Sequence, residues 1–548
     1  MRRSYTLSVF LIMLMGIPSL FAQERYQEPV FSRADINVTL DVEYGQNVSI
    51  LPVILGQSDD PIAVPLLMDI YEPNAEVDTL ENRPLILFAV TGTFFPAYAN
   101  AGFTGERNDS AVVEIAKRFT EMGYVVAVTQ YRRGWNPTST EIEAQRTILQ
   151  AAYRGIQDLR NAVRFFRWSV EENENLYGVD IDKIAVGGTG TGAYVSYGAT
   201  YLSSIEEVLL QKFIDFDVDP PAPFVDTLIL GDVNGVNPAL LNVPNYPEYS
   251  SAFNVGFGMD GALGDTSFIS EGEPPYIAVH SAFNPGAPYD IGDVIATNAS
   301  TGLPFAVIPT ASGGLGTLRK ANAMGLQDIF KDVEWTDPFS PIAASRNGGV
   351  LGLMPLITPS EQVGQDAMCL GIGVPGDTLL HYDQPWAWFD KIIGAGAWNF
   401  AFADQIADGT QITGDQAVCR SSRGIPNDPV VGRAYIDTVI GFIAPRLSLA
   451  LGLDSGDTTT TSNRVYIEDT NVEVFPNPAE ERFTIAYRTN AKRIGAVQVM
   501  DFTGRVIRSI DDLNTRSVEI QRKGLASGIY LLRIQVGEDF VSRRIQFD

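Results

Sequence analysis

The chain has 548 residues, 45% of them hydrophobic, and a formal net charge of −27 at pH 7. The length predicts two or more domains with a sizeable core. The negative charge argues against binding to nucleic acid or to anionic membrane surfaces, because both require a basic patch. Two cysteines and two histidines without metal-like spacing predict no metal site, and we expect no cofactor.

Residues 1–22 have the composition of a signal peptide. Arg2 and Arg3 precede an apolar stretch, Val9–Ile17, that is too short to span a bilayer, and Ala22 offers a small residue for cleavage. No other run of about 18 apolar residues is present. We therefore expect an exported protein whose mature chain has no transmembrane segment.

Predicted strands and helices alternate in the next part of the chain. Apolar–polar alternation within 36–71 predicts paired edge strands, and the continuous apolar runs 84–90 and 123–128 have the length of buried strands. Residues 111–122 favour a helix, and apolar residues at steps of three and four from Leu149 to Val170 predict a longer one. This alternation predicts an α/β fold with a doubly wound, mostly parallel sheet.

A glycine-rich turn, Gly188-Thr189-Gly190-Thr191-Gly192, follows the apolar run that begins at Ile184. It resembles the nucleophile elbow of α/β-hydrolases, G-x-S-x-G, in which a serine sits on a sharp turn between a strand and a helix. The flanking glycines allow the two backbones to approach closely. Gly190 occupies the position of the nucleophile, so the turn predicts a degenerate nucleophile position.

The resemblance to α/β-hydrolases covers about residues 38–450 and is to the esterase/lipase branch with an HGG oxyanion motif. A typical member needs a nucleophile, a base, a carboxylate that orients the base, and amide donors for the oxyanion. The segments that carry the resemblance, besides the elbow, are Pro84–Phe94, Ala127–Gly134, Gln157–Phe165, Pro274–His280 and Pro288-Tyr289.

The acid and base positions that the resemblance implies also depart from the family pattern. Asn284 stands at the acid position, where it carries no charge. The base is expected to follow the predicted strand 305–308, but residues 309–316 contain no histidine. His280 is expected to be a structural histidine of the core.

The oxyanion segment is altered as well. Val90 stands in place of its histidine, and Thr91-Gly92-Thr93 stand in place of its glycines. The backbone amides of Gly92, Thr93 and Thr191 remain candidate oxyanion donors.

Residues 336–430 are expected to form a lid or an insertion, or alternatively surface loops stapled for stability. They contain Cys369 and Cys419, the sole cysteine pair, which we expect to form one disulfide in an oxidising compartment; two free thiols are the alternative. In the chain-entropy model, closing this loop would stabilise the fold by about 4 kcal/mol. The pattern of residues 435–453 predicts an amphipathic helix that closes the hydrolase-like domain.

The last part of the chain changes character. Residues 454–464 are polar and lack periodicity, as in a linker, and short β-prone runs within 465–548 predict a small all-β sandwich. This part resembles the type A sorting domain of Bacteroidota type IX secretion cargo. The matching motifs are Val474–Pro478, Asp501–Arg505 and Gly524–Tyr530. The resemblance implies the type IX secretion machinery as a partner, and a location in the medium or on the cell surface.

Together these observations predict an exported protein with a hydrolase-like domain at 23–453. The leading hypothesis is a catalytically inactive protein that binds an unidentified small molecule or cell-surface ligand, or serves as a surface component. The alternative is an active carboxylesterase that uses Thr191 or Thr189 with His381. His381 lies outside the expected base loop, but a long insertion could bring it to the elbow.

Overall fold

The computed structural model describes residues 25–453 and 472–547, apart from 101–103, 285, 299, 302, 359, 363–378, 382–383, 390–427, 489–491, 501–505, 511–512 and 537–538. The predicted signal peptide, the predicted linker, Cys369 and Cys419 therefore lie outside the described residues. No helix among the described residues is long and apolar enough to cross a membrane.

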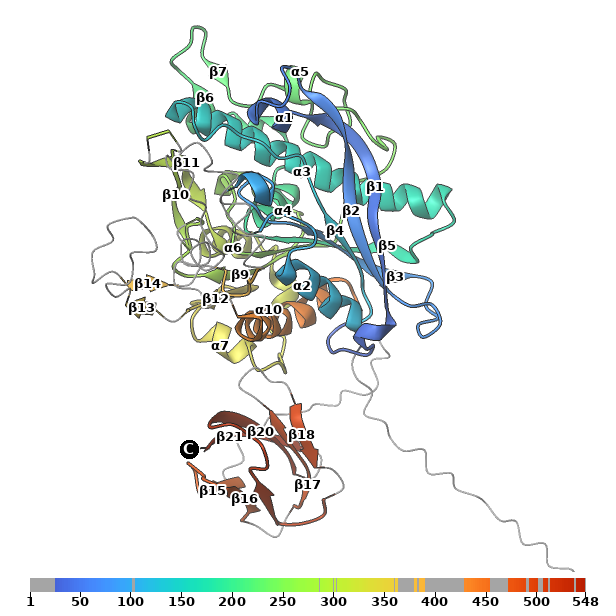
Figure 1. Cartoon of the computed structure of the whole chain (residues 1–548), viewed down its shortest axis with the longest axis vertical. Coiled ribbons are helices and arrows are strands. Elements are labelled where there is room, and N and C mark those ends of the chain that lie inside the picture. The colour runs from blue at the N-terminus through green and yellow to red at the C-terminus, as the bar shows by residue number, and fades with distance from the viewer. Residues whose placement is uncertain are drawn as a thin grey trace, which may run out of the picture.

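The body is built on an eight-stranded sheet with the order β1-β2-β4-β3-β5-β8-β9-β12 (Figure 1). The pairs β1–β2 and β2–β4 are antiparallel, and all other neighbours are parallel. The sheet is therefore mostly parallel and doubly wound, as predicted. Its strands are β1 (Ile36–Ser49), β2 (Ile62–Pro73), β3 (Arg83–Ala89), β4 (Val125–Thr129), β5 (Val179–Thr189), β8 (Val255–Met259), β9 (Tyr276–Ser281) and β12 (Leu353–Leu356).

Helices cover both faces of this sheet, because its central strands are apolar on both sides. Neighbouring residues of β5 point to opposite faces. On one face, Gly187 lies against the ring of Phe257, which packs on Phe119 of α2; on the other, Gly188 lies against Gly192 of α4. The α-helices are α1 (Leu51–Ile54), α2 (Ser110–Glu121), α3 (Glu141–Glu172), α4 (Thr191–Tyr201), α5 (Thr227–Leu230), α6 (Gly314–Ala323), α7 (Ser340–Ala344) and α10 (Pro429–Ala450).

Among the described residues of the body, three two-stranded sheets lie outside the main sheet. They pair β6 (Ile214–Asp215) with β7 (Ala222–Pro223), β10 (Ile291–Thr297) with β11 (Pro304–Ser312), and β13 (Ser360–Gln362) with β14 (Leu379–His381).

An ion-pair network joins α2 and α10, two helices that are far apart in the sequence of the body. The Glu114 carboxylate of α2 accepts hydrogen bonds from Arg33 and Arg118, and it lies 3.3 Å from Nε of Arg433 of α10. Arg118 also pairs with Asp437 of α10. Burial raises the pKa of Glu114, but the hydrogen bonds from Arg33 and Arg118 outweigh it and lower this pKa to about 2. The carboxylate is therefore charged at neutral pH and fixes α10 against α2.

A second ion pair lies deep in the body, between the end of β4 and α3. The guanidinium of Arg132 is 2.8 Å from the Asp158 carboxylate, and both side chains are fully buried. Arg132 also donates hydrogen bonds to Gln157 and to the carbonyl oxygen of Leu241. The fully buried Arg154 lies one turn earlier on α3, and its pKa is lowered to about 9 by burial and by the charge of Arg132.

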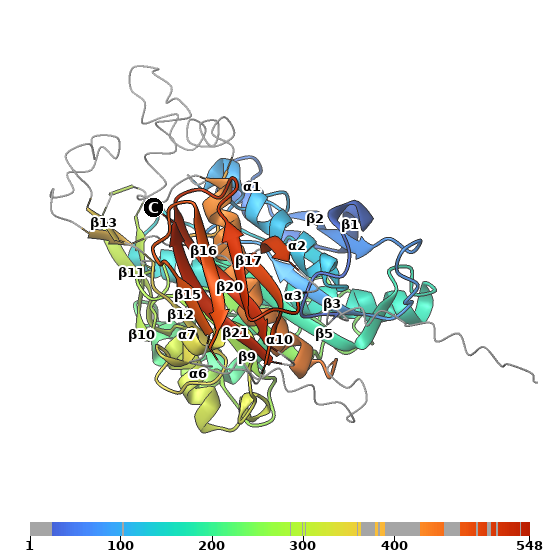
Figure 2. The ribbon, with the colours of Figure 1, turned by 90° about the horizontal axis from the view of Figure 1, so that it is seen from below.

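The C-terminal residues form two antiparallel sheets around a separate hydrophobic cluster. This agrees with the predicted small β-sandwich, and its strands can be followed in Figure 2. One sheet has the order β15-β16-β19 and the other β18-β17-β20-β21. The strands are β15 (Val472–Phe475), β16 (Arg482–Tyr487), β17 (Ile494–Met500), β18 (Val506–Ile510), β19 (Ser517–Gln521), β20 (Gly528–Val536) and β21 (Asp539–Phe547).

Candidate functional site: the elbow between β5 and α4

The glycine-rich turn forms a sharp elbow between β5 and α4. Gly190 has φ 54° and ψ −121°, a conformation that L side chains rarely adopt, and its N–H donates to the carbonyl oxygen of Met259 at 3.0 Å. A Cβ on Gly188 would lie 2.4 Å from the backbone of Gly192, and a Cβ on Gly192 would lie 2.1 Å from the carbonyl oxygen of Ala89. Only glycine therefore fits at the two flanking positions.

A threonine that follows the neighbouring strand, β3, fills the place of the missing nucleophile. A Cβ on Gly190 would lie 2.1 Å from Oγ1 of Thr91 and 3.1 Å from Cβ of Thr91. Thr91 follows β3 by two residues and is 6% exposed. Thr91 lies in the segment that resembles the oxyanion motif, and only the folded chain brings it beside Gly190.

The two threonines within the elbow take part in hydrogen bonds of their own. The indole N–H of Trp386 donates to Oγ1 of Thr189 at 3.1 Å. The Tyr131 hydroxyl lies 3.1 Å from Oγ1 of Thr191 and 3.0 Å from the carbonyl oxygen of Val90. Burial raises the pKa of Tyr131 to about 12. Among the described side chains, neither threonine contacts an imidazole.

A buried carboxylate lies beside the position assigned to the acid. Asn284 donates a hydrogen bond from Nδ2 to Oδ2 of Asp260 at 2.7 Å, and the N–H of Ser281 donates to Oδ1 at 2.7 Å. Asp260 is 1% exposed and directly follows β8, the strand next to β5. An Asp-Gly pair at the end of an apolar run is the sequence signal that identifies this carboxylate.

The strand that was expected to precede the base is not part of the main sheet. The predicted strand 305–308 lies within β11, which pairs with β10 in a separate two-stranded sheet and is not part of the main sheet. The last strand of the main sheet is β12, and the chain continues from it into β13 and β14. His381 ends β14, where its backbone pairs with Ser360. His381 thus follows the last strand of the main sheet; its side chain is outside the described part of the chain.

The oxyanion segment is tightly folded. Gly92 has φ 124° and Thr93 has φ 53°. The Thr93 hydroxyl donates to the carbonyl oxygen of Gly92 at 2.7 Å, and the indole of Trp135 donates to the carbonyl oxygen of Thr93 at 2.9 Å. Thr191 is the first residue of α4, so its N–H belongs to the positive end of a helix.

His280 has a structural environment, as expected. It is fully buried; its Nδ1 accepts from the N–H of Gly314 at 3.3 Å, and its Nε2 lies 3.3 Å from the carbonyl oxygen of Ala287. With Nδ1 as an acceptor and Nε2 as a donor, the neutral imidazole satisfies both partners. Burial lowers the pKa of His280 to about 4.

The lowered pKa of His280 predicts a loss of stability in mild acid. Below pH 6.5 the unfolded chain binds a proton that the folded chain does not. The contribution of neutral His280 to the free energy of unfolding is therefore fully present above that pH. It falls by about 3 kcal/mol as the pH decreases to 4. Urea unfolding of wild type and His280→Asn at several pH values measures this. The stability difference between the two proteins should shrink as the pH falls, and a constant difference would contradict the assignment.

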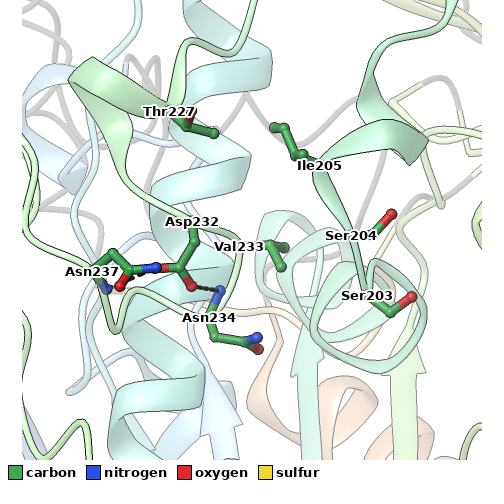
Figure 3. A pocket seen from close by; sticks show the side chains of 8 residues that line it. All are labelled: Ser203, Ser204, Ile205, Thr227, Asp232, Val233, Asn234 and Asn237. Atoms are coloured by element: carbon green, nitrogen blue, oxygen red, sulfur yellow. Dashed lines mark hydrogen bonds between the residues drawn. The ribbon is translucent and has the colours of Figure 1, made fainter.

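A cavity of about 420 Å³ opens at the other end of α4. Figure 3 shows its lining side chains. Asp232 accepts hydrogen bonds from the backbone N–H groups of Asn234 and Asn237, and the Ser203 hydroxyl donates to Glu207. These polar groups therefore stabilise the loops to which they belong. Ser203 follows the C-terminal end of α4, about 16 Å from the elbow by helix rise. The residues that line the cavity are Ser203, Ser204, Ile205, Thr227, Asp232, Val233, Asn234 and Asn237.

The described residues contain no group of three or more histidine, cysteine, aspartate or glutamate side chains that could hold a metal ion. The elbow is therefore the candidate site with the most specific geometry in the part of the chain that the structure describes.

Solved structures that resemble this chain include three of esterase 2 from Thermogutta terrifontis. The form phosphorylated by paraoxon has 15% identity over 60% of this chain and 84% of the esterase, with a TM-score of 0.29. The apo form has 15% identity over 60% of this chain and 84% of the esterase, with a TM-score of 0.28. The propionate-bound form has 15% identity over 60% of this chain and 85% of the esterase, with a TM-score of 0.27. The strand order and the elbow geometry, rather than these matches, carry the fold assignment.

No curated protein matches the chain. Residues 473–547 match the family model of the secretion system C-terminal sorting domain. The C-terminal part of the chain is therefore a sorting domain of the type IX secretion system, and the protein is secreted or displayed at the cell surface, with a body of the α/β-hydrolase fold.

Proposed function

We propose that the body is a catalytically inactive α/β-hydrolase domain that acts in binding, or as a surface component, after export. The observation that carries the proposal is the composition of the elbow. Position 190 has no side chain, and Thr91 fills the space that a nucleophilic side chain would occupy. Asn284 at the acid position carries no charge. Loss of a triad member reduces turnover by roughly 10⁴–10⁶-fold in well-studied hydrolases, so a protein altered in this way retains binding as its main capability.

A second candidate function is carboxylesterase activity, and two observations favour keeping it. The Asp260 carboxylate is buried at the carboxyl end of β8, and His381 follows the last strand of the sheet. Acid and base then occur in the chain order typical of this fold. In this alternative the hydroxyl would come from Thr191 or Thr189, or from Thr91, which lies nearest to the missing nucleophile.

We also propose the domain limits that the sequence predicts: a signal peptide at 1–22, the hydrolase-like body at 23–453 with a lid or insertion at 336–430, a linker at 454–464 and the sorting domain at 465–548. The separate hydrophobic clusters of the body and of the C-terminal strands support this division. The type IX machinery would recognise the last of these segments.

Hydrolysis of short p-nitrophenyl esters by the full chain tests the two functions. We expect turnover no higher than the rate without protein, and no covalent labelling by an organophosphate. The variants Thr91→Val, Thr191→Val, Thr189→Val and His381→Ala should then be indistinguishable from wild type. Robust wild-type hydrolysis that is abolished by His381→Ala and by one threonine variant would establish the esterase and identify its nucleophile.

A further inference from the structure

The segment Gln384–Phe389, here called the strap, crosses the elbow. Nε2 of Gln384 would lie 3.3 Å from a Cβ on Gly190, and the Trp386 indole donates to Thr189, 197 residues away in the sequence. Trp386 is 1% exposed. The strap therefore places a large planar side chain directly against the elbow.

The strap is anchored on α10 through a glycine. A Cβ on Gly432 would lie 2.4 Å from Cε3 of Trp388 and 3.0 Å from the carbonyl oxygen of Trp386. The guanidinium of Arg433 lies 5.2 Å from the centre of a Trp388 ring. Glycine is unfavourable within a helix, so its presence at 432 is explained by the close approach of the strap.

The conformation of the strap is irregular. It turns through a hydrogen bond from the N–H of Ala387 to the carbonyl oxygen of Gln384, and Gln384 has φ 47°. Left-handed conformations are unfavourable for side chains such as glutamine and occur preferentially at ligand clamps and switch regions. Segments outside regular secondary structure also open at lower free energy than core strands and helices.

We propose that the Trp386 indole is the internal occupant of a ligand site at the elbow, and that the strap opens to admit a planar aromatic ligand with a hydrogen-bond donor. The inference rests on the proposed binding function and specifies its ligand class. Its basis is that the space beside Thr189 already accepts an indole with its N–H paired, at the carboxyl ends of the strands where ligands bind in such folds. While Trp386 is in place, the site is closed.

Replacing the indole tests whether this space accepts a free ligand. In the full-length Trp386→Gly variant, free indole should raise the melting temperature, because it binds only the folded state. Indene, which has the same shape but lacks the N–H, should bind about fivefold more weakly, as expected for one lost hydrogen bond. The preference for indole should disappear when Thr189→Val is added. A folded Trp386→Gly variant that binds neither compound would overturn the proposal.

A second variant tests the opening without removing Trp386. The Cβ of Gly432→Ala collides with Trp388 and should displace the strap, so this variant should bind indole more tightly than wild type in calorimetry. The control is Val430→Ala, an exposed change on the same helix, which should bind indole as weakly as wild type does. Indole binding by Trp386→Gly without tighter binding by Gly432→Ala than by wild type would overturn the opening of the strap. Ester hydrolysis by wild type would instead refute the proposed function, and it would leave the indole results unchanged.

Discussion

Asp158→Ala is expected to lower the free energy of unfolding of the body by about 3–5 kcal/mol, because it leaves a buried guanidinium without its counter-ion. Asp158 and Arg132 are both fully buried. Arg154, also buried, is stabilised in its charged form by Asp158 and destabilised by Arg132. Removing the carboxylate therefore leaves two positive charges in one region of low dielectric.

Urea unfolding of the full chain, followed by the intrinsic fluorescence of the body, measures the effect. The matched control is Asp290→Ala. It breaks the pair between Asp290 and Arg319, whose side chains are 44% and 53% exposed, and should cost less than about 1 kcal/mol. Equal effects of the two substitutions would show that the buried pair is not a major source of stability.

Gly190→Ser is expected to destabilise the protein and to create no esterase. The new side chain meets two penalties: the backbone conformation of residue 190, and the collision with Oγ1 of Thr91. Strain in a rarely populated conformation costs about 1–3 kcal/mol, and overpacking costs a similar amount. The combined loss is therefore about 2–6 kcal/mol.

Two further variants separate these penalties. Gly272 also has a positive φ, of 82°, but an added Cβ there meets nothing within 4 Å, so Gly272→Ser reports the cost of a positive φ without a collision. Thr91→Gly removes the colliding atoms, so the double variant Gly190→Ser/Thr91→Gly should be more stable than the sum of the single effects predicts. Additive effects would mean that Thr91 does not fill the nucleophile position.

The elbow could be predicted from the sequence because its determinants are local. Gly188 is required by its contact with Gly192, four residues later at the start of the next helix, and Gly192 belongs to the same short motif although its own contact is with Ala89 of β3. The sheet and its helices were predictable for a similar reason, since their apolar periodicities are properties of continuous segments.

The surroundings of the elbow depend on contacts that no local pattern contains. Residues 305–308 are as apolar as a strand of the main sheet, yet β11 pairs with β10 instead, and only the hydrogen-bonding partner distinguishes the two cases. The true last strand, β12, has four residues and is too short to be recognised by periodicity. Asp260 and Thr91 follow strands on either side of β5, so their proximity to the elbow exists only once the sheet has formed.

The joining of α2 to α10 has a consequence for the order in which the chain can fold. Arg118 and Asp437 are 319 residues apart, as are Glu114 and Arg433. Contacts of such long range form late and slowly, because a large loop must close before they contribute. The first half of the body therefore cannot complete its packing until residue 437 is available. A nascent chain shorter than that remains incompletely folded, which is the state in which a polypeptide can still be threaded across a membrane before it matures outside the cell.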